Sequence, residues 1–191
     1  MLFATLLLAA LVQTTSDPLT ARMEAQARTY EFARPSPGIH FSPRAAAAYA
    51  MASGCVPAVA TGRPAREFFE TAATRSRTDD RGRYTVSTAV TLQQGAHGDC
   101  TVTSDRGQPE ELREALLKSL DDAGASRTVA SDTGEGSQDS NGSFRQELHC
   151  LTLDGQSMFL VMSTSSARNR PRLMASLGSD AGGDCRRRLG A

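Results

Sequence analysis

Four widely spaced cysteines constrain the fold of this chain more than any other feature: Cys55, Cys100, Cys150 and Cys185. No C-x-x-C pair is present, so the spacing does not favour a zinc site or a thioredoxin-like redox centre. In an oxidising compartment such cysteines form two disulfides, for which three connectivities exist. Pairing Cys55–Cys100 with Cys150–Cys185 closes the shorter loops and is preferred. The alternative is four reduced thiols in a cytosolic protein.

The expected hydrophobic core is modest for a chain of 191 residues. Aromatic residues make up 5% of the chain and tryptophan is absent, so the core must be built mainly from Val, Leu and Ala. Such a core benefits from disulfides, each of which stabilises a domain by roughly 3–4 kcal/mol. The 21 basic and 21 acidic residues cancel, so no global field draws the protein to nucleic acid or to an anionic membrane.

The N-terminus predicts export. Residues 2–12 are almost all apolar, and a helix of that length is too short to cross a hydrocarbon core of roughly 30 Å. The length suits the apolar region of a signal peptide. We therefore expect residues 1–16 to be a signal peptide, cleaved between Thr14 and Asp17, and the mature protein to be periplasmic or extracellular with no transmembrane segment. The alternative is a buried N-terminal helix or strand of a cytosolic domain.

The rest of the chain divides into three parts. Residues 17–42 form an arm or loosely docked leader, because the Pro-rich and Gly-rich segment 34–38 interrupts regular structure. Residues 43–185 form a single disulfide-supported α+β domain, and residues 186–191 form a basic tail.

The first half of the domain predicts helices followed by a hairpin. Ser42 and Pro43 begin an alanine-rich helix over 45–52, which Ser53 and Gly54 end. A second short helix begins near Pro64 and places Phe68, Phe69 and Ala72 against the core. Residues 84–92 alternate between apolar and polar and predict one half-buried strand; after a turn at 95–98, Cys100 and Val102 share a face on the return strand. The clearest helix runs from Pro109 to Gly124 and has the buried stripe Leu112, Leu116 and Leu120.

The second half repeats this order. Residues 131–143 predict a flexible loop. A hairpin then turns at Asp154-Gly155 and returns over 158–162, with Phe144, Leu148 and Cys150 pointing inward. Arg170-Pro171 opens a short last helix with Leu173 and Leu177. The predicted fold is therefore α+β, with about four mostly antiparallel strands in two hairpins and helices packed on one face.

One segment carries a resemblance to known proteins. A helix ending in Gly54-Cys55, a strand, the sequence Gly98-Asp99-Cys100-Thr101-Val102 and a leucine-striped helix are similar to small exported proteins of Proteobacteria, over about residues 45–124. That group has no established activity, so the resemblance implies export and the pairing Cys55–Cys100 and nothing more.

Candidates for chemistry are few, because no strong catalytic motif is present. His97, Asp99 and Cys100 lie close together and could bind a metal or form an activated nucleophile; the alternative is a polar turn that leads into a disulfide. His149 neighbours Cys150, but adjacent strand residues point to opposite faces, so we expect His149 on the solvent side of the sheet. No cofactor or metal is predicted.

Two further groups of polar residues have a functional alternative. Asp132, Glu135, Asp139 and Asn141 are the oxygen ligands that calcium prefers, but they do not fit the register of an EF-hand loop. Arginines gather at 75–83 and at 186–188, where they could bind an anion, yet no aromatic residues interleave with them as in nucleic-acid surfaces.

These observations favour an exported, non-catalytic binding or envelope-associated domain, whose partner is an envelope protein or glycan and not a nucleic acid. Two alternatives remain: a periplasmic hydrolase that uses His97 or His149, and a module that binds a metal or small ligand.

Overall fold

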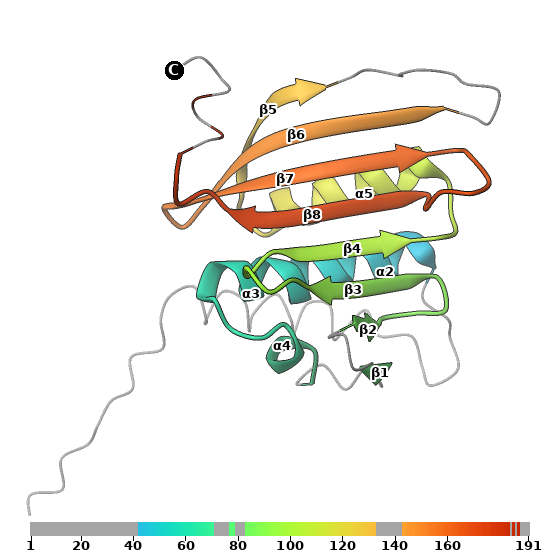
Figure 1. Cartoon of the computed structure of the whole chain (residues 1–191), viewed down its shortest axis with the longest axis horizontal. Helices are drawn as coiled ribbons and strands as arrows, with labels where there is room; N and C mark the ends of the chain where they lie inside the picture. The colour runs from blue at the N-terminus through green and yellow to red at the C-terminus, as the bar shows by residue number, and fades with distance from the viewer. Residues whose placement is uncertain are drawn as a thin grey trace, which may run out of the picture.

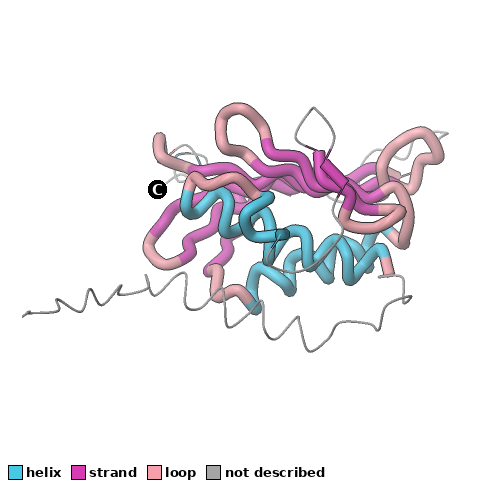
Figure 2. Tube along the Cα trace, turned by 90° about the horizontal axis from the view of Figure 1, so that it is seen from below, coloured by secondary structure: helices cyan, strands magenta, loops and turns pink. Residues whose placement is uncertain are grey.

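The protein is an α+β domain in which an antiparallel sheet packs against helices on one face, as the fold class predicts (Figures 1 and 2). The computed structural model describes residues 42–70, 77–78, 83–132, 143–183, 185 and 187. The predicted signal peptide, almost all of the leader and most of the basic tail lie outside these residues. Within them, every helix is too short or too polar to cross a membrane.

Among the described residues four helical segments come first in the chain, and a fifth then separates two groups of four strands. The helical segments are α2 (Pro43–Ala50), the π-helix η1 (Met51–Cys55), α3 (Val56–Thr61), α4 (Arg66–Glu70) and α5 (Pro109–Asp122). The strands are β1 (Arg77–Thr78), β2 (Arg83–Thr85), β3 (Val90–Gln94), β4 (Cys100–Ser104), β5 (Ser126–Asp132), β6 (Phe144–Leu153), β7 (Gln156–Ser165) and β8 (Leu173–Ser179). Their order in the sheet is β1-β2-β3-β4-β8-β7-β6-β5, and all neighbours are antiparallel.

The last helix predicted from the sequence is wrong, because residues 173–179 form strand β8. Leu173 and Leu177 are spaced for a helix, but together with Ala175 they also alternate, and all three are fully buried. Pairing on both sides decides between the two patterns, since β8 lies between β4 and β7. β8 therefore joins the two hairpins into one sheet of eight strands, where four strands were expected.

The single strand predicted over 84–92 is also wrong. The chain turns at residues 86–89, and β2 pairs with β3 so that Tyr84 lies opposite Leu92. The Ser87 hydroxyl accepts hydrogen bonds from the backbone N–H groups of Ala89 and Val90, at 3.2 and 3.1 Å. Such local acceptors favour turns. Both residues of the pair are buried, so the alternation was real but belongs to two strands.

The alanine-rich helix continues past Gly54, where the sequence predicted its end. Residues 51–55 widen into η1, and α3 follows until Gly62, which has a left-handed φ of 66°. Pro57 has no N–H to continue the α-helical ladder, and the wider π turn precedes it. Cys55 thus lies within a continuous helical layer and is fully buried.

Helix α5 is confirmed as predicted. Pro109 occupies its first turn, and Leu112, Leu116 and Leu120 are buried against the sheet. Gly124 follows the helix with φ 86°, a conformation that favours glycine. In the two views α5 and the α2–η1–α3 layer lie side by side under the same face of the sheet (Figure 2).

The two disulfides join Cys55 to Cys100 and Cys150 to Cys185, which is the pairing with the shorter loops. Cys100 lies in the same row as Leu177, Leu160 and His149, on the face that the helices cover. Cys150 follows His149 and therefore points to the opposite, open face. One disulfide thus lies inside the core, and the other anchors the C-terminal segment on the open face.

Candidate functional site

The face of β6 that the helices cover is not the face that the sequence predicted. Glu147, His149 and Leu151 are buried under the helices, whereas Leu148 and Cys150 are only half-buried on the open face. His149 was expected on the solvent side but has no exposed surface. The prediction followed the apolar residues at the start of the strand. It missed that Leu151 and Leu153, next to the turn, continue the same face as the charged residues.

Four side chains meet on this face, from α5 and β6: Arg113, Arg145, Glu147 and His149, hereafter the ionic cluster. The guanidinium of Arg113 donates two hydrogen bonds to Glu147, from Nε to Oε2 at 2.7 Å and from Nη2 to Oε1 at 2.8 Å. Arg145 Nη2 lies 3.3 Å from the same Oε1. Glu147 is 2% exposed and Arg113 is 18% exposed, so the pair is largely shielded from water and ties α5 to β6.

Further ion pairs connect the ionic cluster to the edge strand β5. Arg145 donates to Asp132 at 3.2 and 2.7 Å. Arg127 on β5 donates to Asp121 on α5, at 3.2 and 3.0 Å. Asp132 was predicted to belong to a flexible loop, but residues 131–132 complete β5 and pair with β6. Charged contacts therefore hold β5, β6 and α5 together.

His149 is the exceptional member of the ionic cluster. Its Nε2 lies 3.8 Å from Glu147 Oε1, and neither ring nitrogen has a hydrogen-bond partner. Burial lowers the pKa of His149; Glu147 opposes this effect, while the charges of Arg127 and Arg113 lower the pKa further. The imidazole is therefore neutral at pH 7.

Burial and the neighbouring charges act in opposite directions on the pKa of Glu147. Burial alone would raise the pKa of its carboxyl group, but the hydrogen bonds and the charge of Arg113 outweigh burial, with support from His149 and Arg145, and hold the pKa below its ordinary value. The same hydrogen bonds raise the pKa of Arg113. Glu147 is thus ionised at neutral pH and accepts hydrogen bonds only.

The geometry of the ionic cluster does not resemble a hydrolase centre. A histidine beside a carboxylate acts as a general base when its free nitrogen reaches a nucleophile or the substrate. Both nitrogens of His149 are enclosed, and Glu147 is occupied by Arg113. The arrangement favours a structural role that responds to charge.

The other predicted histidine lies in an exposed turn. His97 is exposed at residues 95–98, and Asp99 packs over Gly95, where a Cβ would lie 2.2 Å from its Oδ1. The sulfur of Cys100 is bonded to Cys55, so it offers no thiolate. Within the described ranges no group of three His, Cys, Asp or Glu side chains could hold a metal ion. The turn leads into a disulfide, which was the alternative to a reactive site.

The remaining predicted candidates are only partly described. Of the proposed calcium ligands, Asp132 pairs with Arg145; Glu135, Asp139 and Asn141 lie outside the described residues. Of the arginine groups, only Arg77, Arg83 and Arg187 are described. Sequence reasoning missed Arg113 and Glu147, whose partnership joins two elements far apart in the chain. The only signal was the alternation that places Arg145, Glu147 and His149 on one face with Leu151.

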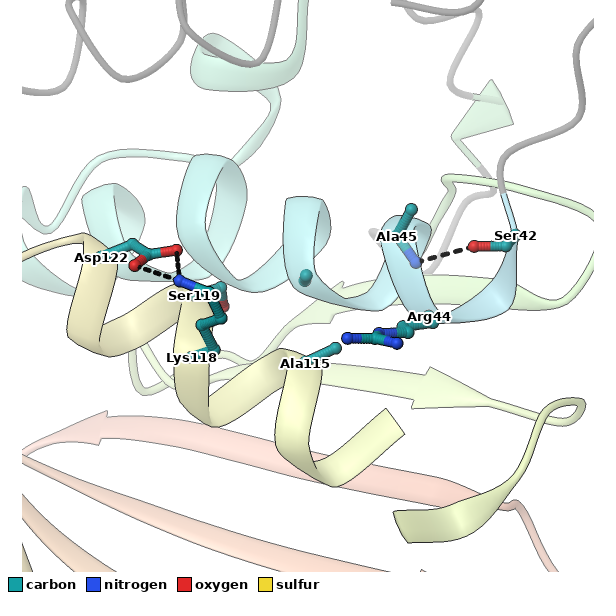
Figure 3. Close-up of a pocket in the computed structure, with 8 residues that line it drawn as sticks. Ser42, Arg44, Ala45, Ala115, Lys118, Ser119 and Asp122 are labelled. Carbon is teal, nitrogen blue, oxygen red and sulfur yellow. Dashed lines mark hydrogen bonds and ion pairs between the residues drawn. The ribbon is translucent and has the colours of Figure 1, made fainter. Parts of the chain in front are cut away.

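Two hollows lie outside the ionic cluster. A groove of about 340 Å³ runs between α2 and α5, with Arg44 on one side and the Lys118–Asp122 ion pair on the other (Figure 3). Alanines line its floor, among them Ala45 and Ala115. A smaller hollow of about 110 Å³ adjoins Cys150 and Asp180.

The open face of the sheet carries apolar side chains that no described helix covers (Figure 2). Leu148 lies opposite Val161, and Phe159 lies beside Gly178, where a Cβ would come within 2.5 Å of the ring. The glycine therefore lets the phenyl ring lie across β8. Met174 lies on the same face of β8, opposite Ser163, and is 47% exposed.

No protein-family model matches the chain, and no curated protein is similar to it.

Proposed function

We propose that this protein is exported and acts without catalysis, as a binding domain that presents the open face of its sheet to an envelope partner. The observation that carries the proposal is the set of apolar side chains Leu148, Phe159, Val161 and Met174 on a face that no described helix covers. Apolar side chains that gather on a surface mark interaction sites. Thr and Ser side chains lie among them and supply polar groups for the contact, such as the Thr101–Ser176 hydrogen-bonded pair at 2.8 Å, in which Ser176 is opposite Val161.

The proposed compartment rests on the two disulfides as well as on the apolar residues at the N-terminus. Two disulfides and no free cysteine are typical of oxidising compartments. Peptide mapping without reductant, on protein recovered from the periplasm or medium, tests this part. We expect the two disulfides with the N-terminus near residue 17. Four free thiols in a cytoplasmic extract, with residues 1–12 still attached, would refute it.

The binding surface is tested with a pair of variants of matched exposure. Met174 and Val129 are 47% and 48% exposed. Met174 lies on the open face of the sheet, whereas Val129 pairs with His149 and lies on the face that the helices cover. We expect Met174→Asp to abolish crosslinking of the oxidised protein to solubilised envelope proteins or its sedimentation with peptidoglycan sacculi, whereas Val129→Asp retains it.

The two probes separate a protein partner from a glycan partner. Equal binding by both variants, or binding to neither probe, would contradict the proposal. A reproducible hydrolytic activity of the purified domain would contradict its non-catalytic part.

A further inference from the structure

The buried imidazole of His149 has a geometry that the proposed binding function does not require. Its side chain is fully enclosed, both ring nitrogens are unpartnered, and a carboxylate lies 3.8 Å away. A buried polar group without partners destabilises a fold by roughly 1–3 kcal/mol. Uptake of a proton by this imidazole would therefore change both its charge and its interaction with Glu147.

Charged groups from three elements act on His149. These are Arg113 from α5, Arg127 from β5 and Glu147 from β6; the facing residue on β7 is the apolar Leu160. Glu110, Asp121, Asp132 and Arg145 form ion pairs with members of this set or with one another. Glu147 is the buried carboxylate of this set, and its Oε1 already accepts from Arg113 and faces Arg145. A protonated His149 would compete for the same oxygen.

We propose that the ionic cluster is an acid-responsive contact: protonation of His149 draws Glu147 away from Arg113 and loosens α5 and β5 from β6, while the end of the sheet at Cys55–Cys100 remains closed. An imidazolium adds a positive charge near Arg113 and Arg127 in a shielded site. The added repulsion and the loss of the bidentate hydrogen bonds both weaken the contact between α5 and β6. The partner-facing surface formed by β6 and β7 would change with external pH.

The direction of the pH effect follows from linkage. The folded state lowers the pKa of His149 below the value near 6.5 of an exposed histidine, so the unfolded or locally open state binds the proton more strongly. Stability is therefore full above pH 6.5 and is lost as the pH falls from 6.5 toward the lowered pKa. Each unit of pKa difference is about a tenfold change in the opening equilibrium.

Two measurements test the proposal on the oxidised full-length protein. The first follows the His149 imidazole signals by NMR from pH 8 to 4, with a histidine-containing model peptide as the reference. We expect His149 to titrate at a lower pH than the peptide histidine, together with shifts in the β5 and β6 amides. Titration of His149 at the pH of the peptide histidine, or titration of His149 without those shifts, would overturn the proposal.

The second measurement compares the pH dependence of Tm in the wild type, His149→Leu and His97→Gln. We expect the wild type and His97→Gln to lose Tm equally between pH 7.5 and 5.5, and His149→Leu to lose much less. An unchanged pH slope in His149→Leu would overturn the proposal. If that variant does not fold, the NMR titration of the wild type decides alone.

Discussion

The two ends of the sheet are held to their helices by different forces. At the β3–β4 end, the α2–η1–α3 layer contributes small apolar side chains, such as Ala46, Ala47 and Ala50, and the fully buried disulfide Cys55–Cys100. At the β5–β6 end, α5 also buries its leucine stripe, but the ionic cluster adds charged contacts there and the disulfide lies on the opposite face. Apolar burial and a covalent bond are insensitive to pH, whereas a buried charge network is not. We therefore predict a permanent end at β3–β4, which keeps its contacts as the pH falls, and a conditional end at β5–β6, whose contacts weaken in acid.

Removal of each disulfide is the strongest way to separate the two ends. The Cys55→Ala/Cys100→Ala double variant opens a loop with a sequence separation of 45 and leaves space where both sulfurs were fully buried. We expect a loss of about 4 kcal/mol from loop entropy and about 1 kcal/mol more from lost packing. Urea titration of the purified variant measures this loss.

The matched control is Cys150→Ala/Cys185→Ala, whose sequence separation is 35. Loop entropy alone predicts a loss of about 4 kcal/mol here too. Because Cys150 is only half-buried, we expect this variant to be the more stable of the two. The reverse order would show that the open-face disulfide, and not the core disulfide, holds the domain together.

Neutralising Glu147 tests the charged end. Glu147→Gln removes the charge that Arg113 and Arg145 share and leaves the largely buried Arg113 guanidinium with only the exposed Glu110 as a counter-ion. Breaking a buried pair on one side costs about 3 kcal/mol, and we expect a loss of that size in the free energy of unfolding at pH 7.

Glu110→Gln provides the control for this variant. Glu110 contacts the same Arg113 guanidinium at 2.9 Å but is 56% exposed, and exposed pairs contribute about 0.5 kcal/mol or less. Equal losses in the two variants, measured by urea titration, would mean that burial does not distinguish the ionic cluster from a surface ion pair.

The two ends also differ, by a smaller free energy, in how the first turns of α2 and α5 are capped. The Ser42 hydroxyl accepts a hydrogen bond from Ala45 N–H at 3.2 Å at the start of α2, and Ser42→Ala should lower the free energy of unfolding by about 1 kcal/mol. Urea titration checks this value. No change would mean that packing alone fixes the start of α2.

The start of α5 has no such cap, and substitution there predicts a gain. Gln108 has the extended conformation of an N-cap residue but makes no side-chain cap. Gln108→Ser should raise the free energy of unfolding by about 0.5 kcal/mol. A gain in Tm measured in the same buffer supports this, whereas a loss would show that Gln108 has a role in the native fold that capping does not replace.

The parts that could be predicted from sequence are those with local determinants. Helix α5 was predicted because Pro109, the leucine stripe and Gly124 lie within one segment, and the β6–β7 hairpin because Asp154-Gly155 specifies its turn. Strand β8 was missed because Leu173 and Leu177 fit two periodicities, and only its neighbours β4 and β7 decide.

The ionic cluster was missed for the same physical reason. Arg113 and Glu147 are 34 residues apart, and each is an ordinary surface residue when considered alone. Their burial depends on how α5 lies under the sheet, behind β7 and β8 and within reach of β6 (Figure 1). His149 was placed on the wrong face because Phe144, Leu148 and Cys150 were assigned to the inner face. The apolar residues next to the turn, Leu151 and Leu153, mark the inner face instead.

The most direct test of a permanent end and a conditional end is residue-resolved hydrogen exchange of the native, oxidised protein at pH 7.5 and 5.5, corrected for intrinsic exchange rates. We predict that amides of α5, β5 and β6 lose protection at the lower pH, up to the limit of about tenfold that one proton allows over this range, while amides of β3 and β4 retain theirs. A uniform loss along the sheet, or equal protection at both pH values, would contradict this account.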